Sequence, residues 1–217
     1  MTVSVRRMET RDVAAVVRVH LRSFPGFFLS FLGPSFLRQL YLGIVEDPSG
    51  IAFVTDSTDG DTVVGVGGFV AGTDQPEGFY RRLLQRRWWH FGLASAVPAL
   101  RRPRIVPRLL RALTMPRRSG EHGADSALLM SIAVEPAGQG TGAGAALVEA
   151  FLDEARRRGR ERVVLTTDAA DNDAVNRFYL QRGFSIVRTL ATPEGRQMNE
   201  YAISLHPESS LPERLTR

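Results

Sequence analysis

The stretch that decides the fold spans residues 127–147 and reads ALLMSIAVEPAGQGTGAGAAL. Its first eight residues, 127–134, form a short apolar run of the kind that builds a buried strand. Pro136 ends this run, because proline has no backbone N–H to donate to a strand ladder. Three glycines follow between Gln139 and Gly144, and the pattern then becomes helical. The stretch therefore predicts a strand, a glycine loop and a helix in succession.

The predicted helix carries small and apolar residues three and four positions apart along one face: Ala143, Ala146, Leu147, Ala150, Phe151 and Ala155. It ends at residues 156–159, Arg-Arg-Arg-Gly, with cations in the last turn and a glycine suited to a left-handed cap. The first turn of such a helix leaves backbone N–H groups unpaired at the positive end of the helix dipole. Because glycines let an anion approach these groups closely, the loop predicts a pyrophosphate-binding site. A tight turn without a ligand is the simpler alternative, although one or two glycines would serve a turn.

Two kinds of protein bind pyrophosphate with such a loop. Gly140, Gly142 and Ala145 fit a loose dinucleotide-binding fingerprint, with Asp168 at the end of the next predicted strand. This alternative would make the protein a nucleotide-dependent oxidoreductase. However, the fingerprint has no counterpart of the proline and glutamine that precede the glycines here. It also usually opens its domain, whereas more than half of this chain comes before the glycines.

The pattern V-x-P-x-x-Q-x-x-G-x-G over residues 134–144 instead resembles the acetyl-CoA signature of the GCN5-related N-acetyltransferase (GNAT) family. Residues 172–184, NDAVNRFYLQRGF, resemble a second block of the same family, with an Asn followed by Phe-Tyr and then Gly-Phe. The two blocks occur in the family's order, separated by one helix and one strand. The sequence is therefore identified as a member of this family, and the resemblance extends over residues 126–190.

The resemblance implies an α/β fold of GNAT type, with a mixed, largely antiparallel central sheet, a splayed strand pair and flanking helices. Local patterns fit this order. Strands are expected at 2–5, 50–55, 62–70, 127–134, 162–167, 185–190 and 198–205, and helices at 10–21, 34–46, 143–158 and 173–182. Residues 1–217 are expected to form a single acetyltransferase domain with a loose tail at 206–217.

The resemblance also implies a site for acetyl-CoA. Its pantetheine arm would enter between the splayed strands and contact the backbone of Ile132, Ala133 and Val134. The pyrophosphate would lie on Gln139, Gly140, Thr141, Gly142, Ala143, Gly144 and Ala145, and Asn172 would contact the cofactor arm. Tyr179 would protonate the leaving thiolate, since the pKa of a phenol, near ~10, is not far above that of a thiol. Simple packing beside Phe178 is the alternative role of Tyr179.

No residue is identified as the general base. Family members often carry a glutamate at one of two strand positions that correspond to Leu128 and Thr167, and neither of these can take up the proton. The candidate substitutes are Asp168, Glu121, His122, Ser131 and His20, besides a water relay through backbone carbonyls. The missing base keeps a second class of function open, a non-catalytic acyl-CoA-binding module with the same fold.

One segment has no place in the minimal fold. Residues 74–125 lie between the third and fourth strands, and residues 78–118 contain eleven arginines and no acid. Aromatic and aliphatic residues recur there at helical spacing, which predicts an inserted helical segment with one apolar face. A lid on the acceptor side is the first interpretation of this segment. Contact with an anionic membrane surface and contact in a homodimer are the alternatives.

Composition narrows the range of partners. All 28 basic residues are arginine and the net charge is +5, which favours anionic ligands without identifying them. The absence of cysteine excludes disulfides and thiolate ligands, and the four histidines lack metal-site spacing, so no metal is expected. No signal peptide or membrane-spanning run is present, which predicts a cytoplasmic protein. The expected acceptor is a primary amine on a small molecule such as an amino sugar, and no nucleic-acid-binding motif is present.

Overall fold

The structure, a computed structural model, describes residues 3–25, 28–59, 62–79, 81–83, 85–86, 125–192 and 195–206. Its helices are α1 (Val13–Ser23), α2 (Phe28–Phe31), α3 (Gly33–Glu46), α6 (Ala143–Arg157) and α7 (Asp173–Leu180). Its strands are β1 (Val5–Arg7), β2 (Gly50–Asp59), β3 (Thr62–Thr73), β4 (Ser126–Val134), β5 (Arg162–Asp168), β6 (Ser185–Ala191) and β7 (Gln197–Ser204). Short 3-10 turns, Thr10–Asp12 and Pro136–Gly138, precede α1 and follow β4.

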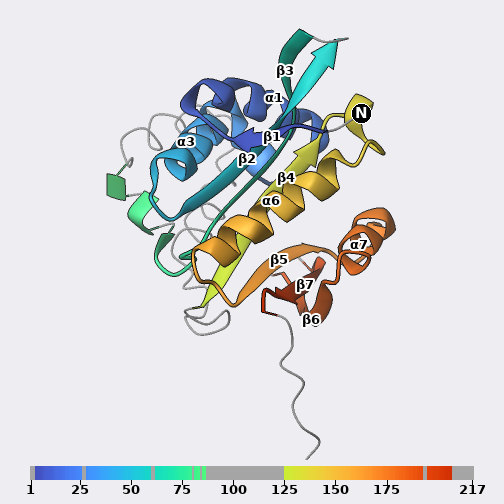
Figure 1. The fold of residues 1–217 in the computed structure, drawn as a ribbon. Helices are drawn as coiled ribbons and strands as arrows, with labels where there is room; N and C mark the ends of the chain where they lie inside the picture. The colour runs from blue at the N-terminus through green and yellow to red at the C-terminus, as the bar shows by residue number, and fades with distance from the viewer. Residues whose placement is uncertain are drawn as a thin grey trace, which may run out of the picture.

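The strands form one seven-stranded sheet in the order β1-β2-β3-β4-β5-β7-β6. Neighbouring strands are antiparallel except for β4 and β5, which are parallel and pair only between residues 126–128 and 162–164. Beyond this short ladder, β4 continues along β3 as far as Val134, and β5 continues along β7 as far as Asp168. The two strands therefore diverge toward their carboxyl ends (Figure 1), which confirms the expected splayed pair.

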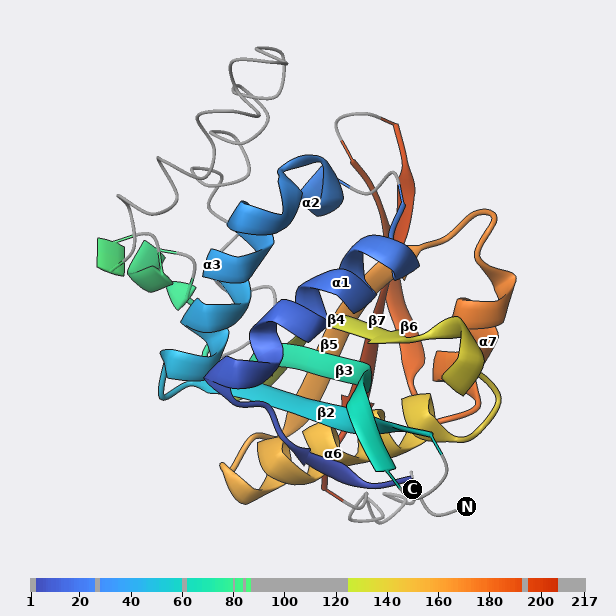
Figure 2. The same cartoon turned by 90° about the horizontal axis from the view of Figure 1, so that it is seen from above.

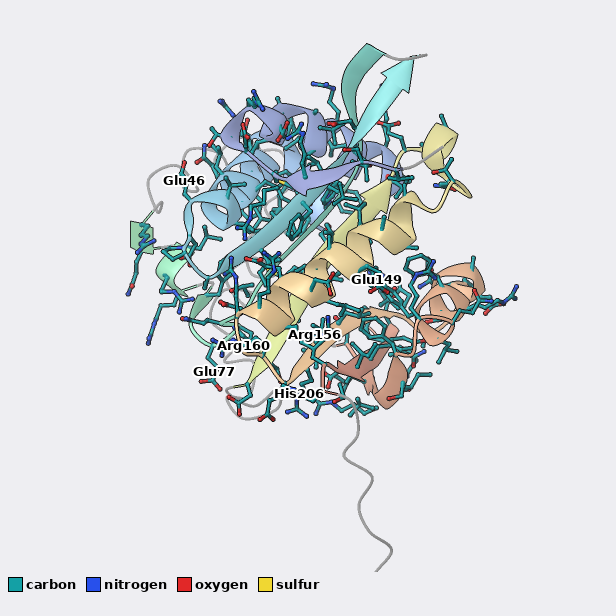
Figure 3. The ribbon with its side chains drawn as sticks, viewed as in Figure 1. Glu46, Glu77, Glu149, Arg156, Arg160 and His206 are labelled. Carbon is teal, nitrogen blue, oxygen red and sulfur yellow. The ribbon has the colours of Figure 1, made fainter. Side chains whose placement is uncertain are left out.

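Helices cover both faces of this sheet (Figure 2). On one face, α1 and α3 bury the apolar stripes predicted from their spacing in a cluster that includes Val16, Leu37 and Phe69. On the other face, α6 buries Leu147 and Phe151 against the sheet. Figure 3 shows Glu149 and Arg156 on α6, and both side chains are exposed. The amphipathic pattern of α6 thus separates its core side from its charged side.

The ladder between β3 and β4 contains a bulge next to the point where β4 leaves β5. Ala71 pairs with Ser131 and Gly72 pairs with Leu129, so one residue of β4 has no counterpart on β3. A Cβ atom on Gly72 would lie 2.1 Å from the carbonyl oxygen of Leu128 and 2.8 Å from the ring of Phe151. Only glycine can therefore occupy this position between the bulged strand and α6.

Some element bounds differ from those expected. The first strand is Val5–Arg7 instead of 2–5, because its pairing with β2 begins at Val5 opposite Thr55. Arg6 holds this strand in place through bonds to Asp12 and Asp56, which the alternation of apolar residues alone did not reveal. The helix α2 lies in the aromatic connection between the first two expected helices, where no helix was predicted.

The beginning of the arginine-rich segment packs against the domain. Phe79 and Leu83 are 1% and 5% exposed and belong to the core cluster of α1 and α3. Arg82 and Arg86 approach the carboxylate of Asp47, at the end of α3, to 3.9 and 3.5 Å. Residues 87–124, which make up most of the expected insertion, and the tail residues 207–217 lie outside the described residues.

Candidate functional site

The glycine loop lies between the end of β4 and the start of α6, as the sequence predicts. Gly140 and Gly142 have φ angles of +77° and +90°, in the left-handed region that favours glycine. Apart from the two residues next to each glycine in the chain, no described residue has an atom within 4 Å of the position that a Cβ atom would occupy there. The backbone of the loop is therefore open to close approach from outside.

The first turn of α6 presents backbone donors to this opening. Gly142 is the N-cap residue and offers no side-chain cap, and the hydrogen bond from Ala146 N–H to the Gly142 carbonyl, at 3.0 Å, begins the ladder of the helix. The N–H groups of Ala143, Gly144 and Ala145 precede that bond and have no partner within the helix. No acidic residue occurs in 139–148. These features fit a phosphate group at the positive end of the helix dipole.

Side chains on either side of the loop hold it in shape. Thr141 Oγ1 donates to the Gly138 carbonyl at 2.7 Å, and Gln139 Nε2 donates to the Val134 carbonyl at 3.4 Å. The carboxylate of Glu135, at the start of the loop, forms an ion pair with Arg22 of α1 at 3.2 Å. Since Arg22 compensates this negative charge, Glu135 repels an incoming anion less than a free carboxylate would.

The carboxyl-terminal half of β4 has a free edge on the side of β5. Ile132, Ala133 and Val134 pair with β3 on one side, and the β4–β5 ladder has already ended at residue 128. Backbone groups that alternate away from β3 are therefore available along this edge, apart from the Val134 carbonyl, which accepts the bond from Gln139. The side chains divide between the faces: Ile132 and Val134 pack with the α6 cluster, and Ala133 packs with the α1 and α3 cluster.

Tyr179 of α7 lies in the same apolar cluster as Ile132 and Val134. It is 4% exposed, and its ring lies 5.2 Å from Phe178 and 5.5 Å from Phe184. Burial raises the pKa of the Tyr179 hydroxyl well above its usual range, so the phenol stays protonated at neutral pH. Both the packing role and the proton-donor role that the sequence suggests are compatible with this position.

Phe178 connects α7 to the glycine loop. A Cβ atom on Gly144 would lie 3.3 Å from the ring of Phe178, and the guanidinium carbon of Arg182 lies 3.6 Å from the centre of that ring. The close contact at Gly144 sets how near α7 comes to the first turn of α6. The last glycine of the signature therefore serves helix packing as well as access to the backbone.

Asn172 precedes α7 but does not cap it. Its side-chain nitrogen donates to Thr167 Oγ1 at 2.8 Å and to the Asp168 carbonyl at 3.1 Å, and no side-chain cap bond is formed. Asn172 is the N-cap residue by position alone, and Asp171, one residue earlier, adopts a left-handed φ of +54°. The side chain of Asn172 instead holds the turn between β5 and α7.

The candidate bases fall into three groups. Asp168 forms a two-pronged ion pair with Arg196, with one contact at 2.7 Å, so its carboxylate is already engaged. Ser131 and His20 are joined through the hydroxyl of Tyr41, in contacts of 3.2 and 2.6 Å. Burial lowers the pKa of His20 to about 4. Glu121 and His122 lie outside the described residues.

Several residues around this site were not singled out in the sequence. Tyr41 contacts the candidate bases Ser131 and His20, and Arg196 bonds the candidate base Asp168. Arg22 bonds Glu135 at the start of the glycine loop. Tyr41 had a detectable signal, because it places a hydroxyl on the helix face otherwise formed by Leu37, Leu40 and Ile44. The two arginines carried no such signal among 28 basic residues.

The described residues offer neither a membrane-spanning helix nor a metal site. None of the described helices is both long enough and apolar enough to cross a bilayer. In the same part of the chain, no three or more carboxylate or imidazole side chains gather into a group that could hold a metal ion.

The fold and the loop define an α/β protein that presents helix N-terminal amides beside a splayed strand pair. The acetyltransferase (GNAT) family model matches residues 14–184, and the chain belongs to this family. Family membership confirms the resemblance, and the dinucleotide alternative is not retained. GNAT proteins are acyl-CoA-dependent acetyltransferases. No curated protein matches the sequence.

Solved structures show the same fold at low sequence identity. Ard1 from Thermoplasma volcanium is 18% identical, with a TM-score of 0.60 over 95% of this chain and 100% of that chain. The ribosomal-protein-S18-alanine N-acetyltransferase from Escherichia coli is 16% identical, with a TM-score of 0.56 over 100% of both chains. Arabidopsis thaliana NAA60 in complex with acetyl-CoA is 14% identical, with a TM-score of 0.59 over 94% of this chain and 98% of that chain.

Proposed function

We propose that the protein is an N-acetyltransferase that moves the acetyl group of acetyl-CoA to a primary amine by direct attack. The observation that carries this proposal is the placement of the glycine loop. The open backbone at Gly140 and Gly142 and the donors of the first turn of α6 lie directly after the free edge of β4. A long ligand with an anionic end could therefore use both features at once.

In this proposal, different residues bind different parts of acetyl-CoA. The loop 139–145 binds the pyrophosphate, and the free edge at Ile132, Ala133 and Val134 binds the pantetheine arm and polarises the thioester carbonyl. Asn172 contacts the arm from the turn between β5 and α7. Its side-chain nitrogen is engaged by Thr167 and Asp168, so we assign any contact with the ligand to its amide oxygen.

The chemistry needs one bond formed, one bond broken and two proton movements. The amine nitrogen bonds to the acetyl carbon, the carbon–sulfur bond breaks, and the nitrogen gives up a proton while the thiolate accepts one. Tyr179 is the proposed donor to the thiolate, because it carries a hydroxyl in the cluster that also contains Ile132 and Val134. Burial raises its pKa further above that of a thiol, so the transfer is less favourable than from a free phenol. Since Asp168 is engaged by Arg196, we assign the proton of the amine to water.

The acceptor is proposed at the level of a primary amine. The E. coli neighbour is named for an alanine of ribosomal protein S18, but at 16% identity this likeness supports the fold alone. The described residues give no support to an amino sugar over other amines. We therefore test acetyl transfer with a panel of four different amines: an Ala-Gly-Gly tripeptide, glucosamine, spermidine and phenethylamine.

Turnover decides between an enzyme and a non-catalytic acyl-CoA-binding module. The assay measures release of free CoA thiol from acetyl-CoA in the presence of each amine, with calorimetry of acetyl-CoA binding run in parallel. An enzyme releases thiol in proportion to an amine of the panel. Binding of acetyl-CoA without release above the amine-free rate would support the module, and failure to bind acetyl-CoA would refute both.

A further inference from the structure

Three polar side chains form a hydrogen-bonded chain through the core between the sheet and helices α1 and α3. His20 Nδ1 lies 2.6 Å from the hydroxyl oxygen of Tyr41, and Tyr41 donates to Ser131 Oγ at 3.2 Å. His20 and Tyr41 are 3% and 1% exposed, whereas Ser131 is partly exposed. The chain therefore leads from a buried imidazole to a serine near the surface of the site.

Apolar packing does not explain why polar side chains occupy these three positions. The ring of His20 lies 4.8 Å from that of Phe24 and 6.4 Å from that of Phe69, inside a cluster built mainly from aliphatic and aromatic residues. Its Nε2 atom is buried and has no hydrogen-bond partner among the described residues. Leucine or phenylalanine would fill the same space without an unpaired polar atom, so a purely structural role would not favour these side chains.

Ser131 stands at the start of the free edge of β4. It follows the bulge opposite Ala71 and Gly72, and β4 has left β5 three residues earlier, at Leu128. Its hydroxyl meets Tyr41 of α3, so it lies on the face covered by α1 and α3. The α6 helix covers the opposite face of the same strand. The two faces of β4 therefore carry different groups: the polar chain on one and the α6 packing on the other.

The position of His20 argues against a role as the proton acceptor. Burial alone lowers its pKa to about 4, and no carboxylate of the described residues offsets the effect. An imidazolium at this place would be poorly stabilised, so His20 remains neutral while the reaction proceeds at neutral pH. A neutral imidazole can still direct the hydroxyl of Tyr41 by a hydrogen bond at Nδ1.

We propose that Ser131 binds the acceptor amine and that Tyr41 and His20 are positioning residues that fix the orientation of its hydroxyl. This inference rests on the proposed acetyl transfer. With Tyr41 O–H donating to Ser131 Oγ, the Nδ1–H of His20 donates to Tyr41, and the second lone pair of Ser131 Oγ is directed to the site. That lone pair accepts an N–H of the neutral amine, which leaves the nitrogen lone pair free to attack.

The proposed roles of Ser131, Tyr41 and His20 are tested with the amine, among the four of the panel, that gives the highest turnover. Tyr41→Phe and Ser131→Ala should each lower kcat/KM for the amine by at least about fivefold, with the affinity for acetyl-CoA within twofold of the parent. Because the two residues act through one chain, the double variant should lose little more than the weaker single variant. Ser131→Thr keeps the hydroxyl and should recover most of the activity.

Two controls separate positioning from folding and from base catalysis. Ser126→Ala removes a buried serine at the other end of β4, where its Oγ accepts a bond from Arg162, and should leave kcat/KM unchanged. His20→Gln should leave the shape of the pH–rate profile unchanged, because His20 does not titrate in the working range. Melting temperatures of all variants show which losses come from unfolding.

The outcomes separate this inference from the proposed function. If the parent turns over the amine and Tyr41→Phe and Ser131→Ala each lose less than fivefold in kcat/KM, the proposed roles of these residues are overturned and the proposed function is not. A limb of the pH–rate profile that disappears in His20→Gln would make His20 the base and overturn its positioning role. A parent that turns over none of the four amines would remove the proposed function and this inference together.

Discussion

At the scale of single residues, burial decides what the two candidate proton-handling groups can do. Burial raises the pKa of Tyr179 and lowers that of His20, so both side chains are held in their neutral forms. A neutral phenol can still donate a proton, whereas a neutral imidazole with a lowered pKa is a poor proton acceptor. Tyr179 therefore keeps a proton that it can donate to the leaving thiolate, although its raised pKa makes it a weaker acid than a free phenol. His20 suits the orientation of its neighbours.

Replacement of Tyr179 by Phe keeps the ring packing and removes the proton. We expect kcat to fall by roughly 10²-fold if the hydroxyl is the general acid, with little change in acetyl-CoA affinity. Phe184→Leu serves as the structural control, because it loosens the same ring cluster without removing a proton donor. Steady-state kinetics and melting temperatures of both variants are measured. An unchanged kcat in Tyr179→Phe would restrict this residue to packing.

The pKa of His20 also predicts how stability depends on pH. The folded-state pKa, about 4, lies below the ordinary value of 6.5, so the unfolded chain binds the proton more readily between these values. The free energy of unfolding should therefore fall as the pH drops through this window, by about 2 kcal/mol between pH 7.5 and 5. Urea unfolding at both pH values measures this difference.

Matched histidine variants isolate this contribution. His20→Gln should lose the pH-dependent difference, while His206→Gln should keep it because His206 is exposed. Stopping at pH 5 avoids the titration of carboxylates such as Asp12, whose pKa is held low by the hydrogen bond from Arg6. If wild type and His20→Gln show the same pH dependence, the imidazole is not kept neutral by burial.

At the scale of elements, the two ends of α6 differ in whether their backbone groups are left open. Its N-terminus at Gly142 leaves N–H groups open, and its C-terminus at Gly159 closes with a left-handed residue and cations in the last turn. Both glycines have positive φ angles and open space around the Cβ position. The two positions thus share their backbone conformation and differ in the proposed ligand contact.

This similarity allows a paired test of the phosphate site. Gly142→Glu places a carboxylate against the proposed pyrophosphate, and Gly159→Glu places the same group in the same backbone conformation at the far end of α6. Each should cost about 1–2 kcal/mol of stability from left-handed strain. Calorimetry should show CoA binding lost in Gly142→Glu and retained in Gly159→Glu. Equal CoA affinities in the two variants would remove the loop from the binding site.

At the scale of the whole molecule, the sequence predicts what depends on local patterns. Apart from α2, the order of the described helices and strands followed from periodicity, and the splayed pair followed from the family resemblance. Contacts between distant segments could not be predicted in this way. The bonds from Tyr41 to Ser131 and from Arg22 to Glu135 join residues 90 and 113 positions apart. No pattern within α1 or α3 specifies those partners.

The contacts of the arginine-rich segment, residues 78–118, could not be predicted from local patterns either. Helical spacing predicted an apolar face in 78–118, and two residues of that face, Phe79 and Leu83, are buried against α1 and α3. The pattern does not tell whether such a face covers an acceptor, a membrane or the protein's own core. For these two residues the core is the partner, and the approach of Arg82 and Arg86 to Asp47 adds charge attraction at the same place.

This packing changes how the role of the segment is tested. Deletion of 78–118 removes Phe79 and Leu83, whereas deletion of 87–124 keeps them; in both variants a flexible glycine–serine linker joins the ends. We expect the second variant to melt at the higher temperature, because the loss of each large buried side chain costs about 2–5 kcal/mol. Both should bind CoA when folded, since residues 139–145 lie outside both deletions.

Turnover of the amine then tests the acceptor-side role of residues 87–124. If they form a lid, the variant that lacks them should bind CoA with the affinity of the parent and show a lower kcat/KM for the amine. Full activity in that variant would refute the lid. Binding of the intact protein to anionic vesicles that is lost on the same deletion would favour the membrane interpretation, because an arginine-rich segment attracts anionic headgroups.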